Sequence, residues 1–195
     1  NPFIGTGGHG HTFPGAVVPH GMIQPSPDTR IDGWDACSGY YYEDSTINGF
    51  SHTHVSGTGC CDYGDVLLMP TVGEQRYQTT DPQSQQLAYS SAFSHENETA
   101  EPGYYSVFLD TYQVKAEISA TKRGAIHRYT FPESSEAGFI LDLDYSLQRQ
   151  TNSDMGIEVI SDTEICGHKK TTYWAFDQYI NFYAKFSKPF SYTLV

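Results

Sequence analysis

The sequence predicts an all-β protein with the architecture of an antiparallel β-sandwich, and three observations carry this prediction. Glycine and proline interrupt the first 70 residues so often that no helix of ten residues fits there without an interior breaker. Short runs rich in β-branched and aromatic residues recur along the rest of the chain, about ten residues apart, with turn signals between them. Several of these runs alternate apolar and polar residues, which is the period of a half-buried strand.

The run VKAEISAT shows this alternation most clearly, because Val114 and Ala116 point to one face and Lys115 points to the other. A chain with fifteen tyrosines and eleven phenylalanines also favours half-buried sheet surfaces. In chain order, we expect strands within residues 16–24, 39–42, 65–73, 104–121, 125–132, 138–145, 156–169 and 178–195.

Residues 78–101 interrupt the strand pattern with a long polar segment, QTTDPQSQQLAYSSAFSHENETAE. The one plausible helical turn of the chain lies here, around Ser84 to Phe93, with Asp81-Pro82 as its start. We therefore expect a short helical or irregular insertion that covers one face of a sheet.

The whole chain, residues 1–195, is predicted to form a single β-sandwich domain, since it contains no internal repeat and no low-complexity linker. Its last residues read as a strand, a break at Pro189 and the opening of another strand. An unpaired strand edge is an aggregation hazard, so we expect the domain to be truncated before its last strands and a longer polypeptide to continue.

Charge and hydropathy exclude two classes of partner. The chain carries 23 acidic and 11 basic residues, a formal net charge of −12, and its basic residues form no cluster longer than two. A phosphate-binding groove, and with it nucleic acid, is excluded on this basis. No apolar run reaches the roughly 20 residues of a membrane-spanning helix, and no signal peptide is present at the start.

Two His-x-His pairs stand in glycine-rich segments, His9 with His11 and His52 with His54. In a strand, residues i and i+2 share a face, so each pair could hold a metal ion if a third ligand were nearby. The spacings of known structural zinc sites are absent, however. We favour hydrogen-bonding roles within a tightly packed loop region and expect no metal site. The pairing of the four cysteines (Cys37, Cys60, Cys61 and Cys166) stays open.

Trp34 lies in a Gly-Trp-Asp sequence beside Asp35, and three tyrosines follow within a few residues. A tryptophan that packs on the C–H face of a pyranose, with a carboxylate that accepts hydroxyl protons, is the chemistry of a sugar subsite. The alternative is a core tryptophan on a sandwich strand. We favour an exposed ring, because a glycine turn directs it outwards.

Glycoside hydrolysis needs two carboxyl groups, and three sequence-adjacent pairs are candidates. None of them forms a complete acid–base site by its context, because they lie in loops or along one strand face. These pairs are Asp32 with Asp35, Asp62 with Asp65, and Asp142 with Asp144.

Two long motifs make the chain recognisable: NPFIGTGGHGHTFPGAVVPHGMIQPSPDTR (residues 1–30) and GWDACSGYYYEDSTINGFSHTHVSGTGCCDYGDVLLMPT (residues 33–71). They closely resemble the amino-terminal domain of family 92 glycoside hydrolases, the calcium-dependent exo-acting α-mannosidases. GAIHRYTFP, the LDL at 141–143 and WAFDQYINFYAKFSKPF look like later landmarks of the same domain. The Cys60-Cys61 doublet departs from the family motif, which has a single cysteine there.

The resemblance implies a β-sandwich packed on a larger helical catalytic domain that lies beyond residue 195. It implies an α-1,2-mannosidase that hydrolyses terminal α-mannosides of glycans with inversion. The catalytic acid, the catalytic base and the calcium cofactor are expected in the helical domain, so that this chain holds no catalytic residue and no metal. The resemblance also implies a secreted, periplasmic or cell-surface bacterial protein.

The resemblance assigns sugar contact to Trp34, with Asp35, Gly5 and Thr6 beside it in the pocket wall. The remaining candidates are expected to shape the pocket or the interface with the catalytic domain: His9, His11, His52, His54, Asp62 and Asp65. A second hypothesis from another class is an autonomous carbohydrate-binding or interaction module without catalysis. Mannose-containing glycans are the expected partner under both.

Overall fold

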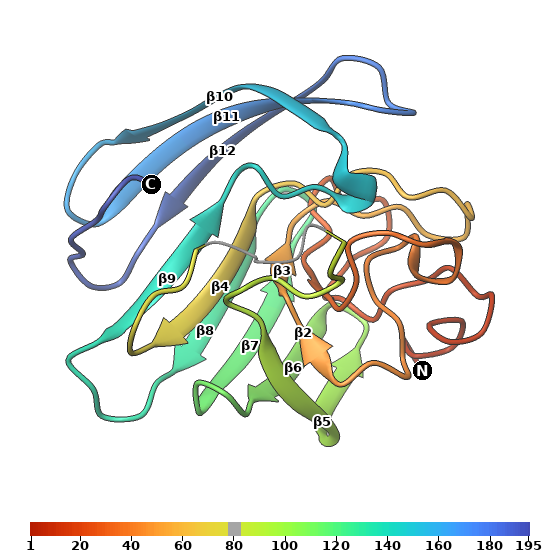
Figure 1. Ribbon diagram of the computed structural model, residues 1–195, viewed down its shortest axis with the longest axis horizontal. Coiled ribbons are helices and arrows are strands. Elements are labelled where there is room, and N and C mark those ends of the chain that lie inside the picture. The colour runs from red at the N-terminus through yellow and green to blue at the C-terminus, as the bar shows by residue number, and fades with distance from the viewer. Residues whose placement is uncertain (78–82) are drawn as a thin grey trace. The chain divides into compact units, whose positions relative to one another are not determined.

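The computed structural model describes residues 1–77 and 83–195 (Figure 1). It forms two compact units, residues 1–149 and 150–195. All paired strands are antiparallel, and the helical segments in the described ranges are two short 3₁₀ turns, Trp34–Ala36 and Leu147–Arg149. The predicted all-β, antiparallel class is therefore confirmed, whereas the single domain over 1–195 stays a prediction. No helix among these residues is long and apolar enough to cross a membrane.

The first sheet of unit 1 has four strands, in the order β1-β3-β4-β9. Its central strand β4 pairs along its whole length with β9, and Met69 lies opposite Ile140. The inward side chains of β4 (Leu67, Met69 and Thr71) are buried, and β9 buries Ile140. The strands are β1 (Ser26–Asp28), β3 (Gly49–Ser51), β4 (Leu67–Val72) and β9 (Ala137–Asp142).

The second sheet of unit 1 has five strands, in the order β2-β5-β6-β7-β8, and its last four strands form a meander of hairpins (Figure 1). Strand β7 confirms the predicted alternation, because Val114 and Ala116 are fully buried while Lys115 points away. The strands are β2 (Thr46–Ile47), β5 (Ser91–Glu101), β6 (Tyr104–Leu109), β7 (Val114–Ala120) and β8 (Ala125–Thr130).

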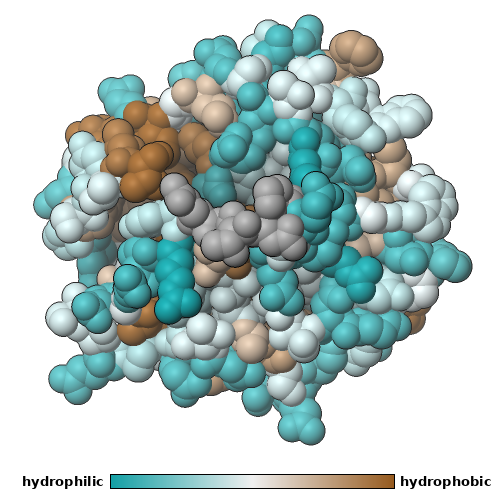
Figure 2. Space-filling model, in the orientation of Figure 1, coloured by the Kyte–Doolittle hydropathy of each residue, from teal (hydrophilic) through white to brown (hydrophobic). Residues whose placement is uncertain are grey.

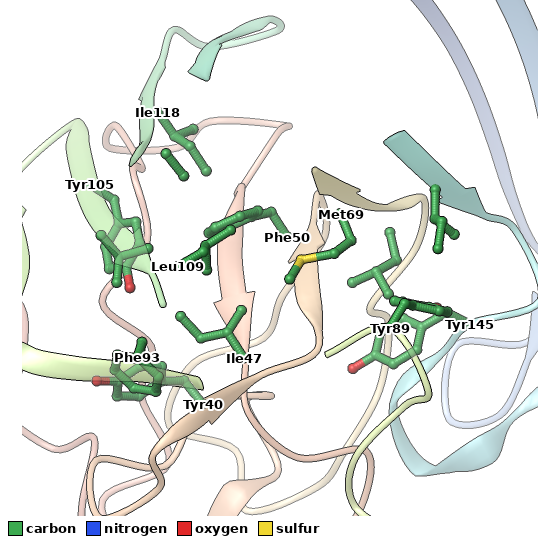
Figure 3. Packing of buried hydrophobic residues seen from close by; sticks show 14 of the residues in the cluster. Tyr40, Ile47, Phe50, Met69, Tyr89, Phe93, Tyr105, Leu109, Ile118 and Tyr145 are labelled. Carbon is green, nitrogen blue, oxygen red and sulfur yellow. The ribbon is translucent and has the colours of Figure 1, made fainter. Parts of the chain in front are cut away.

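The two sheets of unit 1 face each other across one hydrophobic core, which makes this unit the predicted sandwich. Phe50 on β3 packs against Tyr105 on β6 and Tyr129 on β8, with ring centroids 6.3 Å apart in both cases. Figure 3 shows Phe50 between Tyr105 on one side and Met69 on the other. Burial of such large side chains stabilises a domain by about 1.5–3 kcal/mol each.

Unit 2 is a three-stranded antiparallel sheet, in the order β10-β11-β12. Its strands are β10 (Thr151–Val159), β11 (Glu164–Thr172) and β12 (Gln178–Lys185). Exposure alternates strictly along β12, where Tyr179 and Tyr183 lie on the exposed face. Residues 186–195 form no strand, so the predicted opening of another strand after Pro189 is wrong.

The predicted insertion at 78–101 is wrong in its second half. Residues 91–101 are the long strand β5, and residues 83–90 form turns and bends without a helix; residues 78–82 lie outside the described residues. The strand is polar because a hydrogen-bonded cluster fills part of its inner side. Tyr40 and Tyr105 donate to the buried Glu98 carboxylate over 2.9 and 2.6 Å, and His95 Nδ1 lies 2.6 Å from it.

The runs at 16–24 and 39–42 are also not strands. Pro19 and the positive φ of His20 (58°) turn the chain in the first run. In the second, Tyr40 packs into the core from an irregular loop. Figure 2 shows one face of the molecule, which is largely hydrophilic with hydrophobic side chains gathered in limited patches.

Candidate functional site

Trp34 is exposed on a 3₁₀ turn, outside the hydrophobic core. Gly33 precedes the turn with φ 112°, a conformation that favours glycine, and the indole of Trp34 is 63 % exposed. The outward direction that the Gly-Trp-Asp sequence predicts is thus present in the structure. An exposed tryptophan on a tight turn is available for stacking on a ligand.

The indole is nevertheless held in place by its neighbours. The imidazole of His11 meets it edge to face, with ring centroids 4.7 Å apart and planes at 86°. Gly59 lies against both rings: a β-carbon there would stand 2.7 Å from Trp34 Cη2 and 3.2 Å from His11 Cε1. Any side chain at position 59 would therefore displace the indole.

His11 itself is buried, and its Nε2 atom has no hydrogen-bond partner among the described residues. Its backbone is fixed, since its carbonyl accepts from Ser38 Oγ at 2.7 Å and from the amide of Gly57 at 2.6 Å. The buried imidazole of His11 makes an aromatic contact with the indole and so supports Trp34.

Asp35 and His9 form an exposed pair beside Trp34, through His9 Nδ1 and Asp35 Oδ1. Of the other predicted contacts, Thr6 is buried and its hydroxyl donates to Phe3 at 2.9 Å, so its side chain has a structural partner. The Gly5 carbonyl accepts a hydrogen bond from the amide of Thr12 at 3.1 Å. Thr12 follows His11 directly, so this bond connects Gly5 to the segment that carries His11. Four predicted residues, Trp34, Asp35, His9 and His11, are thus linked by contacts.

His54 lies elsewhere, in a fully buried pair with Asp28 of β1. Nε2 is 2.7 Å from Asp28 Oδ1, and Nδ1 is 2.7 Å from the carbonyl oxygen of Gln24. Neither side chain of the pair has any exposed surface. Gly39 passes so close that a β-carbon there would stand 2.2 Å from Asp28 Oδ1. This pair fixes loops of unit 1 and offers no surface to a ligand.

His52 forms a different contact, with His127 of β8. The two Nε2 atoms are 3.2 Å apart, His52 Nδ1 is 2.6 Å from the carbonyl oxygen of Val66, and His127 Nδ1 is 2.8 Å from the Tyr129 hydroxyl. Nδ1 of His52 must donate to the carbonyl, so its Nε2 accepts from His127, whose Nδ1 in turn accepts from Tyr129. Both imidazoles are neutral in this chain of hydrogen bonds.

The two His-x-His pairs therefore do not converge on an ion. His52 and His54 use their ring nitrogens on different protein partners, and among the residues that the structure describes no group of three His, Cys, Asp or Glu side chains is placed to hold a metal. The shared strand face that the i, i+2 spacing suggested does not form, because β3 ends at Ser51.

Asp62 and Asp65 are buried in the loop that precedes β4. Asp65 accepts from Thr53 Oγ1 at 2.7 Å, and Asp62 accepts from the amide of Tyr63 at 2.9 Å. The other carboxylate pairs are also engaged: Asp32 binds Arg149 at 2.8 Å, and Asp142 accepts from Tyr89 at 2.5 Å. Their contacts are those of residues that hold loops together.

All four cysteines are free thiols. Burial raises the pKa of Cys61 to about 12, and it raises the pKa of Cys37 and Cys60 as well. The Cys61 thiol lies 3.4 Å from the carbonyl oxygen of Gly33, directly before Trp34. Thiols with a raised pKa are poor nucleophiles, so this cluster has a packing role in the structure.

The contact between His52 and His127 predicts sensitivity to acid. Burial lowers the pKa of His52 and lowers that of His127 well below its ordinary value; His54 lowers and Asp28 raises the pKa of His52. The unfolded chain then binds protons at a higher pH than the folded one. Stability is present above the unfolded pKa, near about 6.5, and is lost as the pH falls below it towards the folded values.

We expect the melting temperature of the full-length protein to fall between about pH 7.5 and 5, and to fall less steeply in a His127→Phe variant. The exposed His20 provides the control, because His20→Asn should leave the slope unchanged. An equal slope in wild type and His127→Phe would show that the buried pair does not cause the acid sensitivity.

Sequence reasoning missed three residues that organise this region: Asp28, Glu98 and His127. The strict alternation of AIHRYT carried a usable signal for His127, since it shares the inward face with Tyr129 while Ile126 is 71 % exposed. Asp28 and Glu98 carried no such signal, because each has a partner far away in sequence: His54 lies 26 residues from Asp28, and Tyr40 lies 58 residues from Glu98.

Comparison with known proteins identifies the family. Residues 1–195 match the Glycosyl hydrolase family 92 N-terminal domain. A family GH92 α-mannosidase from Bacteroides thetaiotaomicron, solved in complex with mannoimidazole, is 41 % identical, with a TM-score of 0.91 over 97 % of this chain and 25 % of that chain. A family GH92 inverting mannosidase from the same organism is 30 % identical, with a TM-score of 0.70 over 86 % of this chain and 21 % of that chain.

A third relative is a protein of Arthroderma benhamiae named as an uncharacterized secreted glycosidase, which is 32 % identical over 68 % of this chain and 17 % of its own length. The chain thus spans about a quarter or less of the relatives it matches. With the family match over residues 1–195 and the identity to the solved α-mannosidase, the chain belongs to family 92 of the glycoside hydrolases, as its amino-terminal domain.

Proposed function

We propose that this chain is the amino-terminal part of an inverting α-1,2-mannosidase that removes terminal α-mannosides from glycans. In this proposal it supplies one wall of the sugar pocket. The observation that carries the proposal is the exposed Trp34, held edge to face by His11 and flanked by the Asp35–His9 pair. Its presence in a chain 41 % identical to an α-mannosidase solved with mannoimidazole supports mannose as the sugar.

The residues of the chain would act by binding and orienting. The face of the Trp34 indole packs on the apolar C–H face of a mannose ring, and the Asp35 carboxylate accepts a hydroxyl proton. His9 holds the Asp35 carboxylate through Nδ1. Inverting hydrolysis also needs a general acid and a general base about 6.5–9.5 Å apart, with a water between them. We assign both to the helical domain of the full-length protein, since the candidate carboxylate pairs here have structural partners.

We assign the calcium ion to the helical domain as well. Calcium requires about six to eight oxygen ligands, and no group of three or more His, Cys, Asp and Glu side chains that could hold a metal exists within residues 1–77 and 83–195. When bound, the ion would supply a positive charge that fixes sugar hydroxyls. The residues of this chain complete the pocket from the opposite side.

The proposal predicts a division of labour that can be measured. The full-length protein should release mannose from α-1,2-mannobiose, and NMR should show β-mannose as the first product because of inversion. Residues 1–195 alone should show no activity, with or without calcium, because they lack an acid–base pair. Addition of the separately produced remainder should restore activity if the interface re-forms. Release of mannose by residues 1–195 alone would place catalytic residues within them and overturn the assignment.

A second candidate is an autonomous carbohydrate-binding module, which the exposure of Trp34 also favours. A mannose-containing glycan array on residues 1–195 discriminates between the two. Micromolar binding supports the module, whereas millimolar or absent binding supports a wall that acts only with its helical domain. We also propose a secreted, periplasmic or cell-surface location, which the secreted glycosidase among the relatives supports.

A further inference from the structure

The outer face of the five-stranded sheet carries a hollow of about 560 Å³ that the proposed sugar wall does not use. Trp34, His11 and Asp35 are not among the residues that line it. Its lining residues lie on the neighbouring strands β5, β6 and β7, whose positions in the sheet Figure 1 shows. Its lining residues are Glu96, Asn97, Thr99, Tyr104, Ser106, Phe108 and Lys115.

The register of these strands explains why the lining residues gather there. Ser106 lies opposite Thr99 of β5, and Phe108 lies opposite Lys115 of β7, so all four point to the same face. The alternate residues of β6, such as Tyr105 and Val107, point into the core. The register of β5 shifts between Phe93 and Glu98, and such a bulge bends the strand.

One polar group in the hollow has no partner. Ser106 is only 8 % exposed, and its hydroxyl makes no hydrogen bond with any described residue. A ligand hydroxyl at this position would satisfy it as both donor and acceptor.

The charges around the hollow balance, which selects the class of ligand. Glu117 accepts from Arg128 Nε at 2.8 Å and from the Tyr104 hydroxyl at 2.9 Å, and Lys115 lies 3.4 Å from the same carboxylate. These contacts, led by Arg128, lower the pKa of Glu117 to about 2. The lining also includes the Glu96 carboxylate, so two cations, Lys115 and Arg128, stand against two carboxylates, Glu96 and Glu117. No net positive charge is left for a phosphate or an acidic sugar.

Two aromatic rings, Tyr104 and Phe108, lie in the hollow with the free Ser106 hydroxyl, the Asn97 amide and the Thr99 hydroxyl. Rings that stack on C–H faces, together with uncharged groups that bind hydroxyls, match a neutral sugar. The volume lies within the range of about 300–1,000 Å³ usual for ligand sites. We propose that this hollow is a second carbohydrate-binding site, which holds a neutral hexose-containing glycan chain on the outer face of the β5-β6-β7 sheet.

The proposal predicts glycan binding that survives when the catalytic pocket is blocked. The probes are soluble neutral polysaccharides, α-mannan, β-glucan and xylan, with polygalacturonate as an acidic probe. Binding of the full-length protein is measured by affinity electrophoresis in saturating mannoimidazole. We expect retardation by at least one neutral polymer and none by polygalacturonate. No retardation by any neutral polymer would overturn the proposal, as would preference for the acidic one.

Two variants locate the site. Phe108→Ala should weaken the neutral-polymer affinity at least fivefold, and Ser106→Val, which replaces the hydroxyl with methyl groups, should weaken it at least threefold. Ile126→Ala is the matched control, because Ile126 is 71 % exposed on the neighbouring strand β8 and does not line the hollow. Circular dichroism checks the folding of each variant. Unchanged affinity in a folded Ser106→Val or Phe108→Ala protein would place the binding elsewhere and overturn the proposal.

Hydrolysis of a small aryl α-mannoside separates this proposal from the proposed function. All three variants should keep the wild-type kcat/KM on that substrate, because it is too short to reach a second site. If the wild-type protein does not hydrolyse the aryl α-mannoside, the proposed function is wrong. The polymer-binding result is independent of that outcome.

Discussion

Replacement of Trp34 by alanine in the full-length protein should lower kcat/KM for an α-mannoside about tenfold, which corresponds to about 1.4 kcal/mol. An aromatic contact contributes on the order of 0.5–1.5 kcal/mol beyond the area it buries, and the indole would also lose its burial against the sugar. The melting temperature should stay nearly unchanged, because the ring is 63 % exposed and lies outside the core. Steady-state kinetics and thermal unfolding of the same preparation measure both quantities.

The second tryptophan of the chain provides a matched control. Trp174 lies between β11 and β12 and is 72 % exposed, so Trp174→Ala removes an indole of similar exposure from another part of the chain. Its kcat/KM on the small substrate should equal that of the wild type. Equal losses in both variants would show that the effect of Trp34→Ala is not specific to a sugar contact at position 34.

A second prediction tests whether the orientation of the Trp34 indole matters for activity when the indole itself is kept. Gly59 (φ 65°) and Gly57 (φ 77°) both have backbones that disfavour alanine, but only at Gly59 would the new β-carbon meet the indole, at 2.7 Å. Both alanine variants should lose a similar stability of about 1 kcal/mol from backbone strain. Gly59→Ala alone should also lose activity, because Trp34 is pushed aside. A fully active Gly59→Ala enzyme would show that the orientation of Trp34 is unimportant.

The sheets of this domain were predictable where one face of a strand is apolar and the other polar. Val114 and Ala116 of β7 fulfil that condition, and the period of two places them in the core without any knowledge of their neighbours. Strand β5 does not fulfil it, because its inner side carries Glu98. The partners of that carboxylate, Tyr40 and Tyr105, are known only once the chain is folded. A strand whose inward residue is polar therefore lacks the alternation that predicts a strand, and its sequence resembles that of a loop.

The candidate site was predictable in part for the same reason. The Gly-Trp-Asp turn is local, so the exposure of Trp34 follows from three consecutive residues. The support by His11 depends on a loop 23 positions earlier in the chain, and the separation of His52 from His54 depends on the end of β3. Histidine spacing alone cannot reveal such tertiary partners, whereas the motif resemblance identifies the family that contains them.

The largest effect on stability is expected at His54 of unit 1. Its imidazole is paired with Asp28, and both side chains are fully buried. His54→Ala should lower the free energy of unfolding by about 3–5 kcal/mol, because it leaves a buried carboxylate without its partner. The loss of the contact to the Gln24 carbonyl oxygen, 2.7 Å from Nδ1, adds an unsatisfied acceptor. For a domain of this size, the melting temperature should fall by on the order of 10 °C. Urea unfolding of the full-length protein measures the change in the free energy of unfolding, taken from the transition in which this domain unfolds.

The chain offers a matched pair at its surface, since His9 and Asp35 make the same chemical contact with side chains that are 80 % and 37 % exposed. Water solvates Asp35 when His9 is removed, so His9→Ala should cost less than about 1 kcal/mol. Asp28→Asn should lie between the two, because it removes the buried charge and keeps an oxygen that can accept from His54 Nε2. If His54→Ala costs no more than His9→Ala, neither the buried pair with Asp28 nor the packing of Phe13 on the His54 ring, with centroids 4.8 Å apart, is what holds β1 to its neighbouring loops.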